Sequence, residues 1–365
     1  MNWYNIKNID SIDSPALLVY KERVQQNINY AVKMIGDINL LRPHVKTNKT
    51  SEVCAMMMEA GITKFKCATI AEAEILAMLN ANDVLLAYQP VGPKAKRLLS
   101  LVQQYPRTTF GCVTDNAATA KALSALFSSA NETINVFIDL NTGMNRSGIK
   151  PSNAFALAEQ LISLPGIQFE GLHAYDGHLR DTDLEQRQQK SDAAFSEVLA
   201  LATHIEKLIS KSITIVAGGS PSFPTHIKRN IECSPGTFVY WDWGYKHQVP
   251  DEPFDYAALV LTRVISVVDE QTITTDLGHK SVAAENPFPR VHFLNAADAT
   301  PFSQSEEHLV LKVPDSSAFE VGDVLYGVPV HICPTVALYE KAVVVENNEA
   351  VTTWKIVARD RAINI

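Results

Sequence analysis

Between residues 15 and about 245, short apolar or β-branched runs alternate with longer stretches of helical periodicity. This alternation is typical of repeated strand–helix units around a parallel sheet. Strands are predicted at 15–20, 40–46, 64–68, 83–88, 108–113, 134–140, 168–175 and 213–217, with one more near 234–241. Eight or nine such strands fit a closed (β/α)8 barrel of the TIM type. The alternative is an open doubly wound sheet, which the pattern separates poorly from a barrel.

Helical periodicity fills the gaps between these strands, at 22–35, 51–60, 71–80, 115–128, 152–164 and 182–210. Asp115 and Ser152 stand where N-caps are expected. After Asp255 the pattern changes to alternating strand-like runs such as AALVLTRVISVV and DVLYGVPVHI, which indicates a separate antiparallel β domain. We therefore expect a barrel over residues 14–250 and a β domain over 251–365, with residues 1–13 packing on the latter.

Composition narrows the classes of partner. The 365-residue chain is 46% apolar, enough for two cores, and has a formal net charge of -8. It contains no run of five or more like charges, so we expect neither nucleic acid nor a membrane as partner. Without a leader-like segment or an apolar stretch of about eighteen residues, a cytoplasmic protein is expected. The five cysteines are scattered and lack a CxxC pair, which predicts reduced thiols.

Lys46, in the stretch LLRPHVKTNKT, ends a predicted strand just before a helix that begins near Ser51. Barrel enzymes keep their catalytic groups at this end of the strands. A lysine that faces into a barrel mouth is partly desolvated, which lowers its pKa and makes a neutral amine available to attack an aldehyde. Taken alone, the pattern still favours an ordinary surface lysine, and Lys49 in the same turn is a competitor.

Two further strand ends carry polar side chains. Arg146 follows a strand in INVFIDLNTGMNRSGI, where it can bind an anionic oxygen or pair with a carboxylate. The stretch FEGLHAYDGHL places His173, Tyr175 and His178 together at the next strand end. A single histidine is more often a hydrogen-bonded structural residue, and we favour that interpretation for His173.

Glycine-rich turns follow the last predicted strands. Gly218, Gly219 and Ser220 open a short helix in ITIVAGGSPSFPTH, and the backbone N–H groups of such a turn can bind a phosphate without a lysine. Phosphate sites of barrels commonly lie at this point. Gly236 and Thr237 form a second turn, with Tyr240 beyond it as a candidate phosphate ligand.

His331 and Cys333 are separated by one residue in YGVPVHICPTVAL. If this segment is extended, both side chains project from one face about 6 to 7 Å apart, a spacing that suits one metal ion. Imidazole and thiolate together favour Zn2+ over Mg2+ or Ca2+. On the pattern alone, a buried strand cysteine beside an ordinary histidine is the simpler interpretation.

The stretches SPALLVY, RPHVKTNK, MNRSG and the later motifs, in this order from Ser14 to Thr335, resemble the D-threonine aldolase and D-serine dehydratase group of fold-type III pyridoxal-5′-phosphate (PLP) enzymes, which are related to alanine racemase. The resemblance implies that Lys46 joins PLP covalently and that His44, two residues earlier on the same face, contacts it. It also implies that Arg146 bonds the phenolic oxygen, that Tyr175 lies against the pyridine ring and that His178 is an acid or base. The phosphate would be bound by Gly218, Gly219, Ser220, Gly236, Thr237 and Tyr240.

The same resemblance implies a metal site at His331 and Cys333, with Zn2+ expected and Mn2+ as second choice. In this family aldolases tend to carry an aspartate as second ligand and dehydratases a cysteine, so Cys333 favours dehydration. Asp276 and Lys280, in TTDLGHKSVAAE, either shape the substrate mouth or pair with each other, and we favour the pairing.

The resemblance thus predicts a PLP- and metal-dependent lyase that dehydrates D-serine or D-threonine, with retro-aldol cleavage as the alternative and an amino-acid racemase as a further one. Rivals from other classes are a PLP carrier without catalytic activity and a sugar-phosphate barrel enzyme. Related enzymes complete the barrel mouth with the C-terminal domain of the other subunit, so a homodimer is expected.

Overall fold

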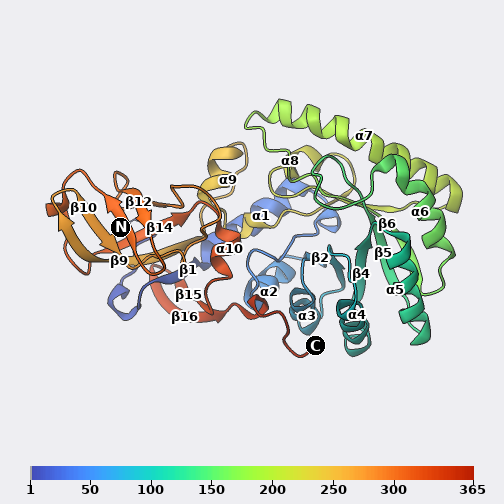
Figure 1. Ribbon diagram of the computed structural model, residues 1–365, viewed down its shortest axis with the longest axis horizontal. Coiled ribbons are helices and arrows are strands. Elements are labelled where there is room, and N and C mark those ends of the chain that lie inside the picture. The colour runs from blue at the N-terminus through green and yellow to red at the C-terminus, as the bar shows by residue number, and fades with distance from the viewer. Residues whose placement is uncertain (1) are drawn as a thin grey trace. The chain divides into compact units, whose positions relative to one another are not determined.

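The computed structural model describes residues 2–365, and contacts within the chain define two compact units (Figure 1). The barrel unit comprises Ala31–Lys46, Cys54–Gly236 and Asp360–Ile365. The β unit comprises the chain up to Tyr30, together with Thr47–Val53 and Thr237–Arg359. The expected division of domains at residue 250 stays a prediction.

The barrel unit is built on a seven-stranded parallel sheet whose order follows the chain. Its strands are β2 (Lys64–Cys67), β3 (Asp83–Leu86), β4 (Thr109–Thr114), β5 (Ile134–Asp139), β6 (Ile167–Ala174), β7 (Thr214–Ala217) and β8 (Glu232–Cys233). The two edge strands are linked by residues 41–45, since Leu41 bridges Cys233 and His44 bridges Lys66. The ring is thereby closed, as expected of a TIM-type barrel.

The closing segment was predicted as a regular strand over 40–46, but it forms only isolated bridges. Pro43 within it lacks a backbone N–H and therefore cannot donate to a ladder. A buried network of ion pairs also holds this segment against the neighbouring strands. Arg42, 2% exposed, donates to both carboxylate oxygens of Asp83 at 2.7 and 2.8 Å and to Glu232 at 2.6 Å. Breaking a buried network of this kind costs about 3–5 kcal/mol, so Arg42 ties the segment to β3 and β8.

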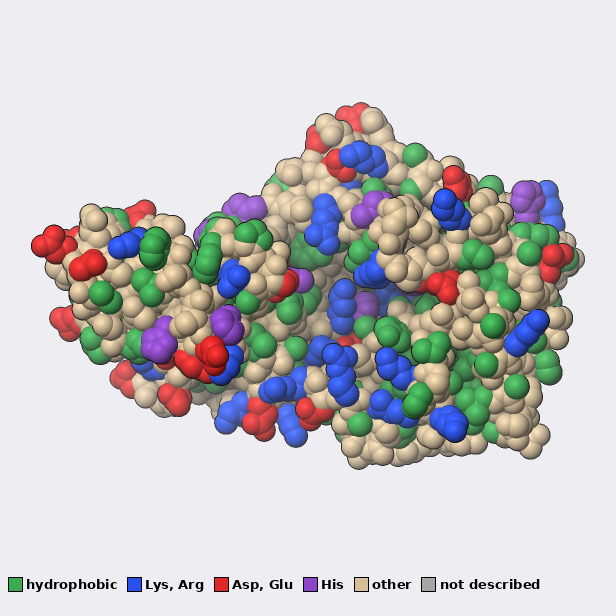
Figure 2. Space-filling model, viewed as in Figure 1, with side chains coloured by type: hydrophobic (Ala, Val, Ile, Leu, Met, Phe, Trp, Pro, Cys, Tyr) green, Lys and Arg blue, Asp and Glu red, His purple; other side chains and the backbone are tan. Residues whose placement is uncertain are grey.

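Helices follow the strands and pack on the outside of the ring (Figure 1). They are α2 (Ser51–Glu59), α3 (Ile70–Met78), α4 (Pro93–Gln104), α5 (Ala117–Ser129), α6 (Pro151–Ser163), α7 (Leu184–Ile209) and the single turn α8 (Phe223–His226). The side chains of Thr69, Asn116 and Asp183 accept hydrogen bonds from the first turns of α3, α5 and α7. Figure 2 shows Lys and Arg side chains gathered around a hollow in the face of this unit.

Two local expectations about helix caps were wrong, and one helix was missed. Asn116 rather than Asp115 caps α5, and Asp115 instead accepts a hydrogen bond from the N–H of Gly148. Helix α6 begins at Pro151 after an extended Lys150, because proline is preorganised for the first helical position, so Ser152 lies inside the helix. Helix α4 was not predicted, although a proline at its start and the buried Leu98 and Leu101 marked it.

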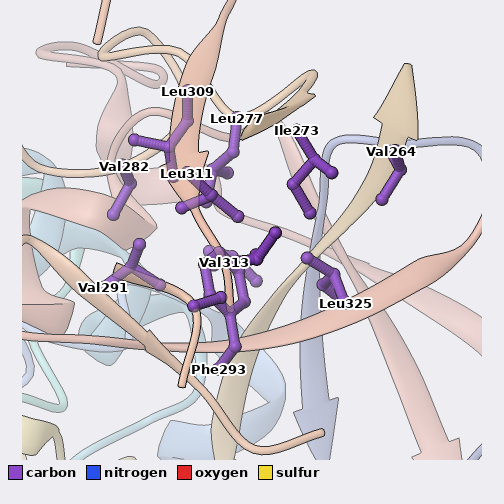
Figure 3. Close-up of a cluster of buried hydrophobic side chains, with 12 residues drawn as sticks. Val264, Ile273, Leu277, Val282, Val291, Phe293, Leu309, Leu311, Val313 and Leu325 are labelled. Carbon is purple, nitrogen blue, oxygen red and sulfur yellow. The ribbon is translucent and has the colours of Figure 1, made fainter. Parts of the chain in front are cut away.

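The β unit contains a nine-stranded, mostly antiparallel sheet, as the C-terminal sequence pattern predicts. Its strands are β1 (Ala16–Tyr20), β9 (Ala258–Asp269), β10 (Thr272–Thr275), β11 (Val291–Phe293), β12 (Thr300–Gln304), β13 (Leu309–Lys312), β14 (Val324–Pro329), β15 (Lys341–Glu346) and β16 (Glu349–Lys355). Helices α1 (Lys21–Ile35), α9 (Trp243–Gln248) and α10 (Ile332–Val336) accompany it in the chain. One of its cores, with Val264, Ile273 and Leu311 among its members, is shown in Figure 3.

Strand β1 corrects the prediction that the barrel begins at residue 15. It pairs antiparallel with β9 and parallel with β15, both in the β unit. Leu17, Leu18 and Val19 are fully buried, and a run buried on both faces fits the interior of either sheet. The strand expected near 234–241 was also wrong, because the two-residue β8 ends at Cys233 and a 3-10 turn follows at Thr237–Val239.

Two simpler expectations concern the whole described chain. None of the five cysteines forms a disulfide, and Cys54, Cys67, Cys112 and Cys233 are buried as free thiols. Within residues 2–365, no helix combines the length and the apolar character needed to cross a membrane.

Candidate active site

A cavity of about 580 Å³ opens in the barrel unit at the ends of the parallel strands. Its polar lining comes from the closing segment and from the strands β2 to β6 and the loops that follow them: His44, Lys46, Lys66, Tyr88, Gln89, Asp115, Asp139, Arg146, Ser147, His173 and Tyr175. Parallel strands all end on one rim of a barrel, so side chains far apart in sequence meet there. Sequence prediction had named Lys46, His44, Arg146, His173 and Tyr175, but not Lys66 or Asp139.

Three cationic side chains surround the ring of Tyr175. The guanidinium carbon of Arg146 lies 5.0 Å from the ring centre, Lys66 Nζ 5.5 Å and Lys46 Nζ 6.0 Å. The backbone N–H of Lys46 donates to His44 Nδ1 over 3.2 Å, which fixes the turn from which Lys46 projects. The cavity therefore combines an aromatic face with a concentration of positive charge.

Lys66, His173 and Asp139 form a buried chain of polar contacts. His173 Nδ1 lies 2.7 Å from Asp139 Oδ1, and Lys66 Nζ lies 3.4 Å from His173 Nε2. Ser147 donates to the other oxygen of Asp139 at 2.9 Å. The sequence of β2, KFKC, contains a signal that could have identified Lys66. A lysine within a buried strand is rare unless its amine has a polar partner.

Burial and mutual charge shift the pKa of each member of this chain. Burial, assisted by the charge of Lys46, lowers the pKa of Lys66 to about 7. Burial and the charge of Lys66 lower the pKa of His173. For Asp139 burial acts in the opposite direction, but the hydrogen bond and charge of His173 outweigh it and lower the pKa of the carboxyl.

The glycine turns lie where a side chain would not fit. A Cβ on Gly219 would stand 2.8 Å from the ring of Tyr175, and a Cβ on Gly236 would stand 2.8 Å from the carbonyl oxygen of His44. The amide of Gly219 donates to Ser222 Oγ at 3.1 Å, and that of Gly236 donates to Ser220 Oγ at 3.2 Å. Both amides thus donate to serine hydroxyl oxygens. Gly218 has a φ of 75°, which favours glycine.

A second buried network, which sequence analysis missed, holds the first of these turns. Asp176 accepts from Ser222 Oγ at 2.5 Å and contacts His226 Nε2 at 2.7 Å, and Arg229 contacts the other ring nitrogen of His226 at 2.7 Å. The hydrogen bond and charge of His226 lower the pKa of Asp176 although burial opposes them. Asp176 and His226 are 50 residues apart in the sequence, so no local pattern reveals this network.

The glycine turns and the other predicted site residues lie outside the lining of this cavity. His178 packs against the loop that carries Arg146. A Cβ added at Gly143 of this loop would lie only 2.8 Å from Nε2 of His178. Thr237 and Tyr240 are buried in the β unit, where Thr237 Oγ1 lies 3.4 Å from Cys333 Sγ. The roles of these three residues stay predictions.

His331 and Cys333 do not lie on one extended segment as expected. His331 is the extended residue before α10, whereas Cys333 lies within that helix. Their side chains nevertheless interact, and Thr47 Oγ1 lies 3.0 Å from Cys333 Sγ. His331 Nδ1 contacts Glu285 Oε1 at 2.5 Å. Burial would lower the pKa of His331, but Cys333 and then Glu285 and Asp242 raise it to about 9.

No group of three or more His, Cys, Asp or Glu side chains suited to a metal ion occurs among residues 2–365. The expected pairing of Asp276 with Lys280 was wrong. Asp276 accepts from Thr262 Oγ1 and from a backbone N–H, while the exposed Lys280 pairs with Glu306 and Glu307.

Family comparisons agree with this architecture. Residues 19–242 match the family model of the alanine racemase N-terminal domain, and residues 257–345 match a second model, named for a serine dehydratase domain. Because the first match covers more than half of the chain, the protein belongs to the alanine racemase N-terminal domain family. Members of this family bind PLP, and the resemblance inferred from the sequence is thereby confirmed.

Individual relatives extend the likeness over nearly the whole chain. The D-threonine aldolase of Arthrobacter sp is 27% identical over 359 residues, which cover 95% of this chain and 93% of the relative. The D-serine dehydratase of Dictyostelium discoideum is 22% identical and covers 96% and 98%. Among solved structures, D-threonine aldolase from Filomicrobium marinum superposes with a TM-score of 0.89 at 24% identity, covering 98% of each chain. At this identity the structural likeness shows the fold alone.

Proposed function

We propose that this protein is a PLP-dependent lyase that acts on D-β-hydroxy amino acids and dehydrates D-serine or D-threonine. The observation that carries the proposal is the position of Lys46, whose amine projects into a cation-rich cavity at the strand ends beside Tyr175. Relatives named as D-threonine aldolase, 3-hydroxy-D-aspartate aldolase, D-threo-3-hydroxyaspartate dehydratase and D-serine dehydratase, each matched over at least 93% of its length, support the same reaction class. Full-length likeness to enzymes also speaks against a PLP carrier.

The cavity fits PLP by size and by chemistry. Its volume of about 580 Å³ lies in the range of small-molecule sites. PLP presents a flat aromatic ring and anionic groups, and the cavity offers the ring of Tyr175 and the cationic side chains of Arg146 and Lys46. We assign the covalent attachment to Lys46 and the phenolic oxygen to Arg146. The other proposed contacts are those of His44, Gly218, Gly219, Ser220, Gly236, Thr237 and Tyr240.

Once bound, PLP supplies an electron sink that stabilises negative charge at Cα of the substrate. The protein has to supply the proton transfers. As a free amine, Lys46 is the base that removes the proton from Cα. Tyr175 is the proposed contact of the pyridine ring. His178 is the proposed acid or base for the aldol alternative. Arg146 fixes the orientation of the anion it binds.

Zn2+ is the proposed metal, with Mn2+ as second choice. The fit rests on the donor set, since His331 and Cys333 offer an imidazole and a thiol whose side chains interact, a pair that suits Zn2+. Glu285 engages Nδ1 of His331 and so leaves Nε2 as the ligating nitrogen. A metal there supplies polarisation of the β-hydroxyl, which makes it a better leaving group.

Product analysis tests the reaction. Purified protein with PLP and Zn2+ is incubated with D-serine or D-threonine, and the expected products are pyruvate or 2-oxobutyrate with ammonia. Glycine with acetaldehyde from D-threonine would instead support retro-aldol cleavage, the second candidate, which is favoured by the names of three of the relatives. Formation of L-alanine from D-alanine without ammonia would contradict a lyase and support a racemase.

A homodimer is part of the proposal, on the ground of the resemblance alone. Its mass in solution, measured by light scattering, is expected to be twice the 40.2 kDa of one chain. A monomer that is stable and fully active would contradict it.

A further inference from the structure

Asp242 is a buried carboxylate of the β unit that joins the starts of two helices. It is 1% exposed and precedes α9, where its Oδ1 accepts the N–H of Tyr245 over 2.8 Å. Its second oxygen, Oδ2, accepts the N–H of Ile332, the first residue of α10, over 3.0 Å. The second bond links segments that are 90 residues apart in the sequence. The proposed function does not use this carboxylate.

The bond to Ile332 supplies a cap that His331 does not provide. The residue before a helix usually satisfies one of the first free N–H groups with its own side chain. His331 holds that position for α10, but within residues 2–365 its side chain makes no capping hydrogen bond. Ile332 is fully buried, and a buried N–H without an acceptor is costly. Asp242 therefore provides the acceptor from outside the helix.

This arrangement leaves the imidazole of His331 available for other contacts. Its Nδ1 contacts Glu285 Oε1 at 2.5 Å, and the His331 side chain interacts with that of Cys333. Cys333 is the second residue of α10, so Ile332 stands between the two proposed ligands. A bond that fixes the backbone of Ile332 thereby fixes the segment from which both side chains project.

Helix α9 also holds the residue before His331. The N–H of Gly244, in α9, donates to the carbonyl oxygen of Val330 over 3.1 Å. A Cβ on Gly244 would lie 2.6 Å from that oxygen, so a larger residue would not fit this close approach. Because Asp242 caps α9 as well, one carboxylate fixes both this helix and the segment that the helix holds.

We propose that Asp242 is a positioning residue of the metal site at His331 and Cys333: its Oδ2 fixes the start of α10 and so leaves the imidazole of His331 free to act as a ligand. The inference rests on the proposed function, because it takes His331 and Cys333 as the metal ligands. Groups that hold metal ligands in place typically change metal affinity by about tenfold to a hundredfold when they are removed.

The test measures zinc affinity in the PLP-loaded protein and its variants, by competition with a chelator of known affinity. Asp242→Ser keeps a good cap for α9, because a serine hydroxyl can accept the N–H of Tyr245, but it lacks the second oxygen that reaches Ile332. Asp242→Ala loses both bonds. Zinc affinity is expected to fall in both variants by the same factor, about tenfold to a hundredfold. The alanine variant should melt at the lower temperature, because it alone loses the cap of α9.

This comparison separates positioning from a purely structural role. If Asp242 only stabilised the fold, zinc affinity would follow the melting temperature, and the serine variant would bind zinc nearly as well as the wild type. Ammonia release from D-serine should be half-maximal at about tenfold to a hundredfold more free zinc in Asp242→Ser. Asp315→Ala removes the exposed cap of the 3-10 turn Ser316–Ala318, also in the β unit. It is the matched control, and wild-type zinc affinity is expected.

Unchanged zinc affinity in Asp242→Ser would overturn the inference, because that variant lacks the bond to Ile332. A fall of equal size in Asp315→Ala would also overturn it. If Asp242→Ala does not fold, Asp242→Ser decides alone. If His331→Ala loses zinc while Asp242→Ser keeps it, the inference falls and the proposed metal site stands. If the wild type holds no zinc that His331→Ala removes, the proposed metal site falls and the inference falls with it.

Discussion

Replacing Lys46 by alanine is expected to abolish the visible absorption of the bound cofactor and to lower turnover by about a thousandfold or more. The variant loses both the covalent link to PLP and the base that removes the proton from Cα. Lys46 lies at the rim of the cavity beside a fixed turn, so the change removes little packing. Absorption spectra and ammonia release from D-serine, measured on the same preparation, check the two effects together.

Lys49→Gly is the control for this experiment. Lys49 has a φ of 55°, a conformation that glycine adopts without strain, and it stands in the same turn. Its replacement should leave the cofactor band in place. A lost band in Lys49→Gly together with a retained band in Lys46→Ala would mean that the wrong lysine of the turn was assigned.

Removing the metal is the second change with a large expected effect. Chelation is expected to lower ammonia release from D-serine by about a hundredfold or more and to leave the cofactor band intact, because the metal acts on the β-hydroxyl and not on Lys46. Added Zn2+ should restore the activity. His331→Ala should reproduce the loss and bind less zinc in an elemental assay, while the exposed His308→Ala, also in the β unit, should bind the wild-type amount.

Ammonia release that is indifferent to chelators, with full zinc content in His331→Ala, would contradict the metal site. If Cys333→Ser retains zinc while His331→Ala loses it, only the assignment of Cys333 as the second ligand is contradicted. The structure makes this outcome informative, since Thr47 and Thr237 both lie within 3.4 Å of Cys333 Sγ and offer hydroxyl groups nearby.

Most of the cavity could be predicted because its residues belong to short segments at strand ends. Lys46 and Tyr175 end predicted strands and Arg146 follows one, and in a closed parallel ring all such positions meet on one rim. Lys66 escaped prediction because it lies inside β2, where periodicity assigns it to a strand and says nothing of its neighbours. The partners of Asp176 and His226 are equally invisible locally, since a hydrogen bond across 50 residues leaves no spacing to recognise.

The placement of β1 illustrates a different limit. Its residues are apolar throughout, so the amino-acid order predicts a strand but not which sheet takes it up, and pairing with β9 and β15 decided the matter. In the same way, the one-residue spacing of His331 and Cys333 suggested an extended segment, whereas the start of α10 between them changed the geometry that brings the side chains together.

The order of residues alone thus determined the two-part architecture and the family and predicted which lysine reacts, because strand periodicity, glycine turns and short stretches of fixed spacing are local properties. Tertiary structure decided where β1 belongs, how Arg42 closes the ring and that Lys66 shares a cavity with Lys46. The physical reason is that pKa values, ion pairs and buried neighbours depend on distances through space, which chain separation does not report.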